Sequence, residues 1–155
     1  MSKKLTLVET DVGFLHQSSQ EVDLGNLDLV NMLEAELLNV FRKMQGKMQG
    51  LAAIQVGKPY KAILLRYVKG EDPIVVYNPK ILFSIGKVKS IEGCMSEGDS
   101  RYLVWRPALA LVSYTNKYRE TKKEWLPYKK ARIFAHEVDH LSGILLQDKG
   151  KLVEA

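Results

Sequence analysis

Two histidines and a glutamate near the end of the chain have the spacing of a metal-binding helix. In the stretch FAHEVDHLSG, residues 134–143, Glu137 directly follows His136, and His140 lies four positions after His136. On an α-helix this spacing places the two imidazoles on one face, about 40° apart around the axis. The pattern HExxH can be an ordinary pair of surface residues, but it can also bind one metal ion beside a glutamate that serves as general base. A catalytic site of the second kind needs a third protein ligand and one open position.

The identity of the third ligand decides which chemistry such a site performs. Metzincin proteases place a histidine six positions after the second one, where this chain has Leu146, which cannot bind a metal. Other HExxH peptidases take a glutamate from a later helix. Here the acids after the motif are Asp148 and Glu154, and the residues after His140 are too few for a further ligand-bearing helix. His16 lies in a loop-like region and is interpreted as a surface or capping residue. Cys94 remains, and a thiolate beside two imidazoles is a sound ligand set for a borderline metal.

The sequence around this only cysteine, IEGCMSEGD at residues 91–99, leaves a predicted strand where backbone can be exposed to a pocket. A lone cysteine is often a small buried side chain, and it can also be a nucleophile. If Cys94 binds a metal, the metal holds the thiol deprotonated and lowers the pKa of a bound water toward about 7. The residues therefore favour a metal-dependent hydrolase.

The composition is that of a single soluble domain. The 155 residues are 46% apolar and 26% charged, which suits one domain over residues 1–155 with one substantial core. No apolar run reaches the roughly 20 residues of a membrane helix, and the start MSKKLTLVETDVGF lacks an apolar signal region. We therefore expect a cytoplasmic protein without a membrane partner. The net charge of +5 is dispersed, which predicts a mildly basic surface but no nucleic-acid motif.

The elements that must position these residues predict an α+β fold with antiparallel sheets around a central helix that carries HExxH. An N-terminal amphipathic helix is expected between an N-cap at Asn26 and a stop at Gly46. Short β-branched runs at 60–68 and 73–79 predict strands, and the segments 80–93 and 108–127 are interpreted as hairpins with longer loops. A last helix is expected from Tyr128 to Leu141, after Pro127.

Three stretches together resemble the motifs of peptide deformylases. QGLAAIQVG, residues 49–57, is similar to the family's GxGLAAxQ; EGCMS at 92–96 is similar to EGCLS; and AHEVDHLSG at 135–143 is similar to QHExDHLxG. They occur in the family's order, and the resemblance extends from about Asp11 to Leu146. It implies a hydrolase that removes the N-formyl group from formyl-methionine at the N-terminus of nascent polypeptides and releases formate.

The resemblance also implies a role for each chemical residue. Cys94, His136 and His140 would bind the metal, and Glu137 would take a proton from the metal-bound water and pass it to the leaving amine. Gln55 and the backbone N–H of Met95 would form the oxyanion hole. The metal would be Fe²⁺ in the cell, with Zn²⁺, Ni²⁺ or Co²⁺ in a purified sample.

For substrate binding, the resemblance implies backbone pairing along two short stretches and a pocket for the methionine side chain. Gly50 fits the first role because a missing Cβ permits close backbone approach. The predicted substrate-binding residues are Gln49, Gly50, Leu51, Glu92, Gly93, Arg101, Arg132 and Ile133, with Lys129 and His136 in the pocket wall. A monomer is expected, with at most weak ribosome contact through its basic surface.

Some positions depart from the family pattern. Met48 stands where the first motif has a glycine, Gln49 replaces an apolar residue, Ala135 replaces a glutamine, and EGD follows Ser96. After Ile144 the sequence continues only with LLQDKGKLVEA, residues 145–155, and this segment is too short for a long C-terminal helix. Two rival functions remain: a neutral metallopeptidase, which would need a ligand other than Cys94, and a deformylase-like binder of nascent chains or RNA, which would need a disabled site.

Overall fold

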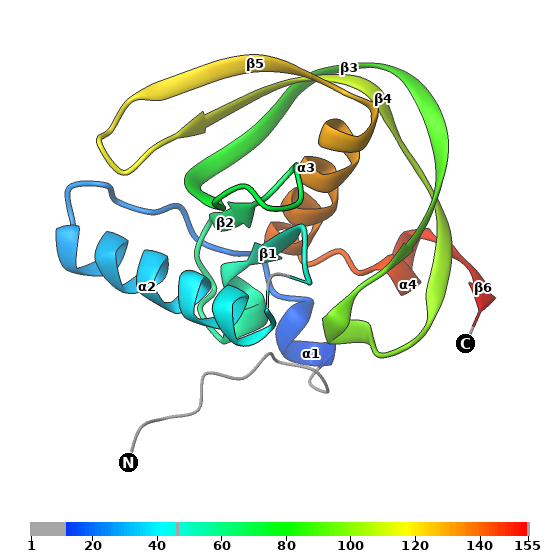
Figure 1. Ribbon diagram of the computed structural model, residues 1–155, viewed down its shortest axis with the longest axis horizontal. Helices are drawn as coiled ribbons and strands as arrows, with labels where there is room; N and C mark the ends of the chain where they lie inside the picture. The colour runs from blue at the N-terminus through cyan, green and yellow to red at the C-terminus, as the bar shows by residue number, and fades with distance from the viewer. Residues whose placement is uncertain (1–11, 46, 155) are drawn as a thin grey trace.

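The computed structural model describes residues 12–45 and 47–154, and these form an antiparallel sheet system with a few helices (Figure 1). The prediction of one domain over 1–155 includes residues 1–11, 46 and 155, which lie outside the described part. The elements in chain order are α1 (Val12–Leu15), α2 (Leu27–Lys43), β1 (Gly50–Ala52), the 3₁₀-helix η1 (Ala53–Val56), β2 (Ala62–Leu65), β3 (Ile74–Gly93), η2 (Met95–Glu97), β4 (Arg101–Thr115), β5 (Thr121–Pro127), α3 (Tyr128–Leu141), α4 (Leu146–Lys149) and β6 (Lys151–Glu154).

The strands form one antiparallel path in the order β1-β2-β3-β4-β5, and β6 adds to the other end of β4. The longest pairing joins β3 and β4 from Tyr77 opposite Thr115 to Gly93 opposite Arg101. This architecture confirms the predicted α+β class with antiparallel strands. The pairing of β6 along Arg101–Leu103 was not predicted, and it places residues 151–154 beside the start of β4.

One hairpin prediction is wrong. Residues 80–93 do not fold back on themselves but continue β3, which is 20 residues long. Gly86 lies inside this strand with a φ of 72°, and a Cβ there would approach the Cβ of Ala108 to 3.2 Å. The glycine therefore allows a positive φ and a close approach to β4 inside a continuous strand, rather than forming a turn. The hairpin predicted at 108–127 exists, as β4 and β5.

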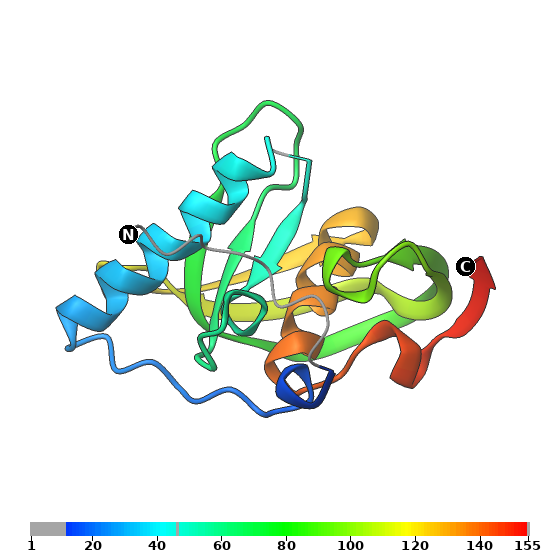
Figure 2. The same cartoon turned by 90° about the horizontal axis from the view of Figure 1, so that it is seen from below.

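Helix α2 covers one side of the sheet, as Figure 2 shows. The Asn26 side chain accepts a hydrogen bond from the Leu29 N–H, which caps the first turn. The buried residues recur at helical spacing and pack against β1, β2 and η1; they are Val30, Leu33, Leu37 and Val40. None of the described helices is long and apolar enough to cross a membrane.

Helix α3 follows β5 without a loop and lies within the curve of β3 and β4 (Figure 1). Its inner side chains, among them Ala131, Phe134 and Leu141, belong to the core cluster under the sheet. The helix ends at Leu141 with Ser142 as its C-cap, and Gly143 follows with a φ of 72°. A Cβ at Gly143 would overlap the backbone carbonyl of His16, so only glycine allows this close approach. One face of α3 thus packs against the sheet, and another face of the helix is directed toward β1 and the end of β3.

Candidate metal centre and substrate cavity

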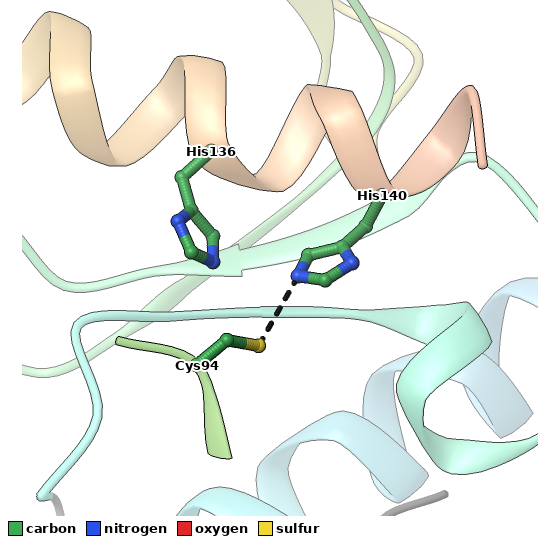
Figure 3. Close-up of side chains that lie close together, drawn as sticks. All are labelled: Cys94, His136 and His140. Carbon is green, nitrogen blue, oxygen red and sulfur yellow. Dashed lines mark hydrogen bonds between the residues drawn. The ribbon is translucent and has the colours of Figure 1, made fainter. Parts of the chain in front are cut away.

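Three ligand atoms from two distant parts of the chain converge at the end of β3. The Cys94 Sγ and one ring nitrogen each of His136 and His140 lie within 4.8 Å of one another (Figure 3). The Cys94 Sγ is 3.4 Å from the His140 Nε2, and both residues are buried. Cys94 lies between β3 and η2, whereas the histidines project from successive turns of α3. The spacing and the donor types suit one divalent cation with an open position.

A chain of buried charges orients His136. Its Nδ1 lies 2.8 Å from the Glu92 Oε1, which leaves the Nε2 for the cluster. Arg106 is 2% exposed and donates to both carboxylate oxygens of Glu92, at 2.8 and 2.9 Å, and to Asp139 at 2.6 Å. Burial alone would raise the pKa of Glu92, but the hydrogen bonds with His136 and Arg106 outweigh it and hold the pKa far below its usual range.

The two histidines have opposite electrostatic surroundings. Burial lowers the pKa of His140 to about 3, so its imidazole is neutral, and its buried Nδ1 has no hydrogen-bond partner among the described residues. Burial also lowers the pKa of His136, but hydrogen bonds with Cys94 and Glu92 outweigh it and raise the pKa to about 10. These hydrogen bonds join His136 and Cys94 at the place where a cation would bind both side chains. The residues present fit a bound metal.

Glu137 points into the same space from the buried side of the helix. It is 4% exposed, its Oε1 lies 3.9 Å from the His136 Nε2, and its Oε2 has no hydrogen-bond partner in the described part of the chain. Burial raises the pKa of Glu137 to about 7. A carboxyl with such a pKa can both accept and release a proton near neutral pH.

Gly50 makes room for this carboxyl. An added Cβ at Gly50 would lie 2.7 Å from the Glu137 Oε1 and 2.8 Å from its Cγ. The sequence suggested that a missing Cβ would admit substrate backbone at this position. The structure adds a second reason for the glycine, because strand β1 runs directly against the Glu137 side chain.

Gln55 reaches the cluster from η1. Its Oε1 accepts a hydrogen bond from the Ala52 N–H at 2.9 Å, and this contact determines which end of the amide faces the metal site. The Nε2 donates to the Ser96 Oγ at 2.9 Å and lies 3.4 Å from the Cys94 Sγ. The donor end of the amide therefore lies beside Cys94.

A cavity of about 970 Å³ brings nearly all the predicted site residues together. His140 is buried and is not among the lining residues. The lining includes all the others: Gln49, Gly50, Leu51, Gln55, Glu92, Gly93, Cys94, Met95, Arg101, Arg132, Ile133, His136 and Glu137. Lys129 also lines it. Their individual roles stay predictions.

Residues that sequence reasoning missed lie behind the ligands and around the cavity. Arg106 and Asp139 received no role, and nothing local in the sequence indicates that they share a buried ion pair. Other unpredicted lining residues are Gln45, Lys47, Met48, Arg66, Lys69, Ile91, Gly98, Asp99 and Ser100. His16 was set aside as a ligand, and its Nε2 lies 2.9 Å from Asp148 in a partly exposed ion pair.

The structure gives a physical reason for some of the unusual positions. Glu97 accepts hydrogen bonds from the backbone N–H groups of Leu146 and Gln147 at the start of α4, each at 3.2 Å. Gly98 has a φ of 74°, which favours glycine at this position. Met48 is 7% exposed and packs in the core cluster under α2. The stretch EGD therefore connects the metal-site turn to the C-terminal segment.

Comparisons with known proteins agree on one family. The family model described as polypeptide deformylase matches residues 4–154. A peptide deformylase of Finegoldia magna is 33% identical over 136 residues, which cover 87% of this chain and 82% of that protein. The crystal structure of a probable peptide deformylase from Synechococcus phage S-SSM7 superposes with a TM-score of 0.84 at 32% identity, over 94% of this chain and 99% of that one. A class I type b peptide deformylase from Acinetobacter baumannii, solved with Met-Ala-Ser bound, has a TM-score of 0.83 at 28% identity over 96% and 99% of the two chains.

Proposed function

The chain belongs to the peptide deformylase family of hydrolases, and from this premise we propose that its cavity removes the N-formyl group from formyl-methionine at the start of nascent polypeptides. The observation that carries the proposal is the convergence of three potential ligand atoms within 4.8 Å at a cavity, beside the buried Glu137, whose Oε2 has no hydrogen-bond partner among the described residues. This arrangement has the parts that hydrolysis of a formamide needs: a metal-ligand set, a proton carrier and amide donors.

Cys94, His136 and His140 would hold one divalent cation, with Fe²⁺ proposed as the native metal and Zn²⁺, Ni²⁺ or Co²⁺ as substitutes. When bound, such a cation supplies Lewis acidity, which polarises the substrate and lowers the pKa of a water in its open position. Glu92 holds His136 in the ring orientation and tautomer that leave the Nε2 available.

Glu137 carries the proton in the proposed reaction. It accepts a proton from the attacking water and returns it to the amine that leaves when the formyl C–N bond breaks. Its pKa of about 7 supports both directions of transfer. Gln55 and the Met95 backbone N–H donate to the formyl oxygen as negative charge develops on it, and the link from the Ala52 N–H keeps the Gln55 amide oriented.

The substrate would lie extended along the cavity. Its backbone would pair with Gln49 and Gly50 on one side and with Gly93 on the other. The methionine side chain would pack among apolar surfaces, including Leu51 and Ile133, both of which line the cavity. The Acinetobacter baumannii relative holds Met-Ala-Ser, which supports a peptide of this kind as ligand.

The proposed substrate also indicates where in the cell the protein would act. Formylated nascent chains are made in the cytoplasm of a bacterium or of a bacterial cell infected by a phage, so this is where we expect the protein to act. A monomer with weak ribosome contact through its basic surface fits the net charge of +5.

The test is anaerobic purification followed by metal analysis and detection of formate released from formyl-Met-Ala-Ser. Glu137→Ala should lose activity yet keep the metal, while Cys94→Ser should lose both. A blocked peptide with cleavable internal bonds serves as the control for a metallopeptidase and should stay intact. Bound metal without formate release would favour a non-catalytic binder, and full metal content and rate in Cys94→Ser would contradict the ligand assignment.

A further inference from the structure

Positive side chains surround the opening of the substrate cavity. Six cations line it, from the loops after α2 and β2, the start of β4 and the first turns of α3: Lys47, Arg66, Lys69, Arg101, Lys129 and Arg132. The lining includes three carboxylates, of which Glu92 is paired with Arg106 and His136 and Glu137 is buried. Asp99 is the remaining one. The opening therefore has a strong excess of positive charge.

Most of these cations have no carboxylate partner among the side chains that the structure describes. Lys47, Lys69, Lys129 and Arg132 form no ion pair with the side chains that the structure describes. Arg101 pairs through its backbone with Glu154 of β6, and Arg66 donates to the Met48 carbonyl and lies over the Phe41 ring. Elsewhere on the surface, cations such as Lys58 and Lys117 have carboxylate partners on α2. Charges of one sign around a concave site raise the local concentration of oppositely charged ligands.

The cations on α3 lie next to the metal ligands. Lys129, Arg132, Ile133 and His136 have spacings of three, four and seven residues, which place them on one face of the helix. That face lines the cavity. The buried Ile133 and the aliphatic stems of Lys129 and Arg132 can pack along a methionine side chain, while the charged ends stay at the opening. The residues that follow the methionine would then meet the charges.

We propose that this cavity selects formyl-methionyl peptides whose second and third residues are acidic. The inference rests on the proposed deformylase function and specifies its substrate class. An extended peptide advances about 3.3 Å per residue and alternates its side chains, so carboxylates at two successive positions face opposite walls of the cavity. Lys129 and Arg132 form one wall, and Lys47, Lys69 and Arg101 come from other elements around the opening.

The experiment compares three peptides that differ only in charge: formyl-Met-Glu-Glu-Ser, formyl-Met-Gln-Gln-Ser and formyl-Met-Lys-Lys-Ser. An exposed ion pair contributes up to a factor of about five, so we expect kcat/KM for the Glu peptide to exceed that for the Gln peptide by about 10-fold, with the Lys peptide slowest. Raising the NaCl concentration should reduce the ratio, because salt screens exposed charges over about 10 Å at 0.1 M.

Two triple variants test whether the charges at the opening cause the preference. In Lys47→Gln/Lys69→Gln/Lys129→Gln, the Glu-to-Gln ratio should fall to about two, because three of the cavity cations are gone. The matched control Lys80→Gln/Lys87→Gln/Lys123→Gln removes the same charge from exposed positions outside the cavity, and its ratio should equal that of the wild type. A ratio within one protein is unaffected by partial misfolding.

The outcomes separate this inference from the proposed function. Formate release at equal rates from all three peptides would overturn the acidic preference and leave the deformylase function standing. The same ratio in both triple variants would overturn the assignment to the cavity charges. No formate from any peptide would overturn the proposed function and this inference with it.

Discussion

The contact between Gly50 and Glu137 gives the sharpest prediction. An added Cβ would lie 2.8 Å from the Glu137 Cγ and 2.7 Å from its Oε1, whereas carbon atoms pack best at about 3.5–4.0 Å. In Gly50→Ala, the carboxyl or strand β1 must therefore move by roughly 0.7 Å or more. A misplacement of about 1 Å can cost about 100-fold in rate. We expect kcat to fall by about 10–100-fold.

The assay measures kcat and KM with formyl-Met-Ala-Ser, together with metal content and thermal unfolding. Because Glu137 is not among the predicted metal ligands, the metal should stay bound. Overpacking should lower stability by about 1–3 kcal/mol, visible as a lower Tm. Gly25→Ala is the matched control, since within 4 Å its Cβ would meet, among the described residues, only the flexible Asp23 carboxylate, at 3.2 Å, and the Arg119 side chain, at 3.4 Å.

Two explanations for Gly50 make different predictions. If the glycine serves only the approach of substrate backbone, then Gly50→Ala raises KM and leaves kcat intact. If it makes room for Glu137, kcat falls. Wild-type kcat in Gly50→Ala, with an unchanged Tm, would refute the reasoning from the Glu137 contact.

Two further predictions concern the charges behind the metal ligands. Glu92→Gln removes the carboxylate that His136 and Arg106 share, so metal affinity should fall by about 10–100-fold; competition with a chelator measures this, and unchanged affinity would contradict the role of Glu92. Glu137 has a pKa of about 7 in the fold, above its ordinary value of 4.5, so the metal-free protein loses stability as the pH rises between these values. Glu137→Gln should therefore raise the Tm of the metal-free protein at pH 8 and change it little at pH 4.5, and a Tm shift of equal size at both pH values would contradict the buried charge.

The local parts of the site were predictable because their information is local in sequence. The four-residue spacing of His136 and His140 requires only helical geometry to place both rings on one face. Cys94 was found through ligand chemistry, since alternatives such as Leu146 lack a donor atom. The structure brings these three residues together, and neither step required knowledge of the sheet.

The remaining features depend on pairing between distant segments. The continuity of β3 through Gly86 is visible only when β4 lies beside it, because a glycine in sequence is equally compatible with a turn. The strand β6 can be identified only from its pairing with Arg101–Leu103 on β4. Strand pairing depends on tertiary context more than helix formation does, and so hairpins were expected where one long strand exists.

Arg106 illustrates the same point at the site itself. On β4 the buried Arg106 follows the exposed Trp105, but no strand was predicted at residues 101–107, so neither its burial nor its partners were predicted. In the fold, the guanidinium joins Glu92 at the end of β3 to Asp139 on α3. Removing one partner from a buried pair leaves an uncompensated charge, so the three groups hold their places together. Through Glu92 this network reaches His136, and the orientation of this predicted metal ligand thus depends on the register of β3 against β4.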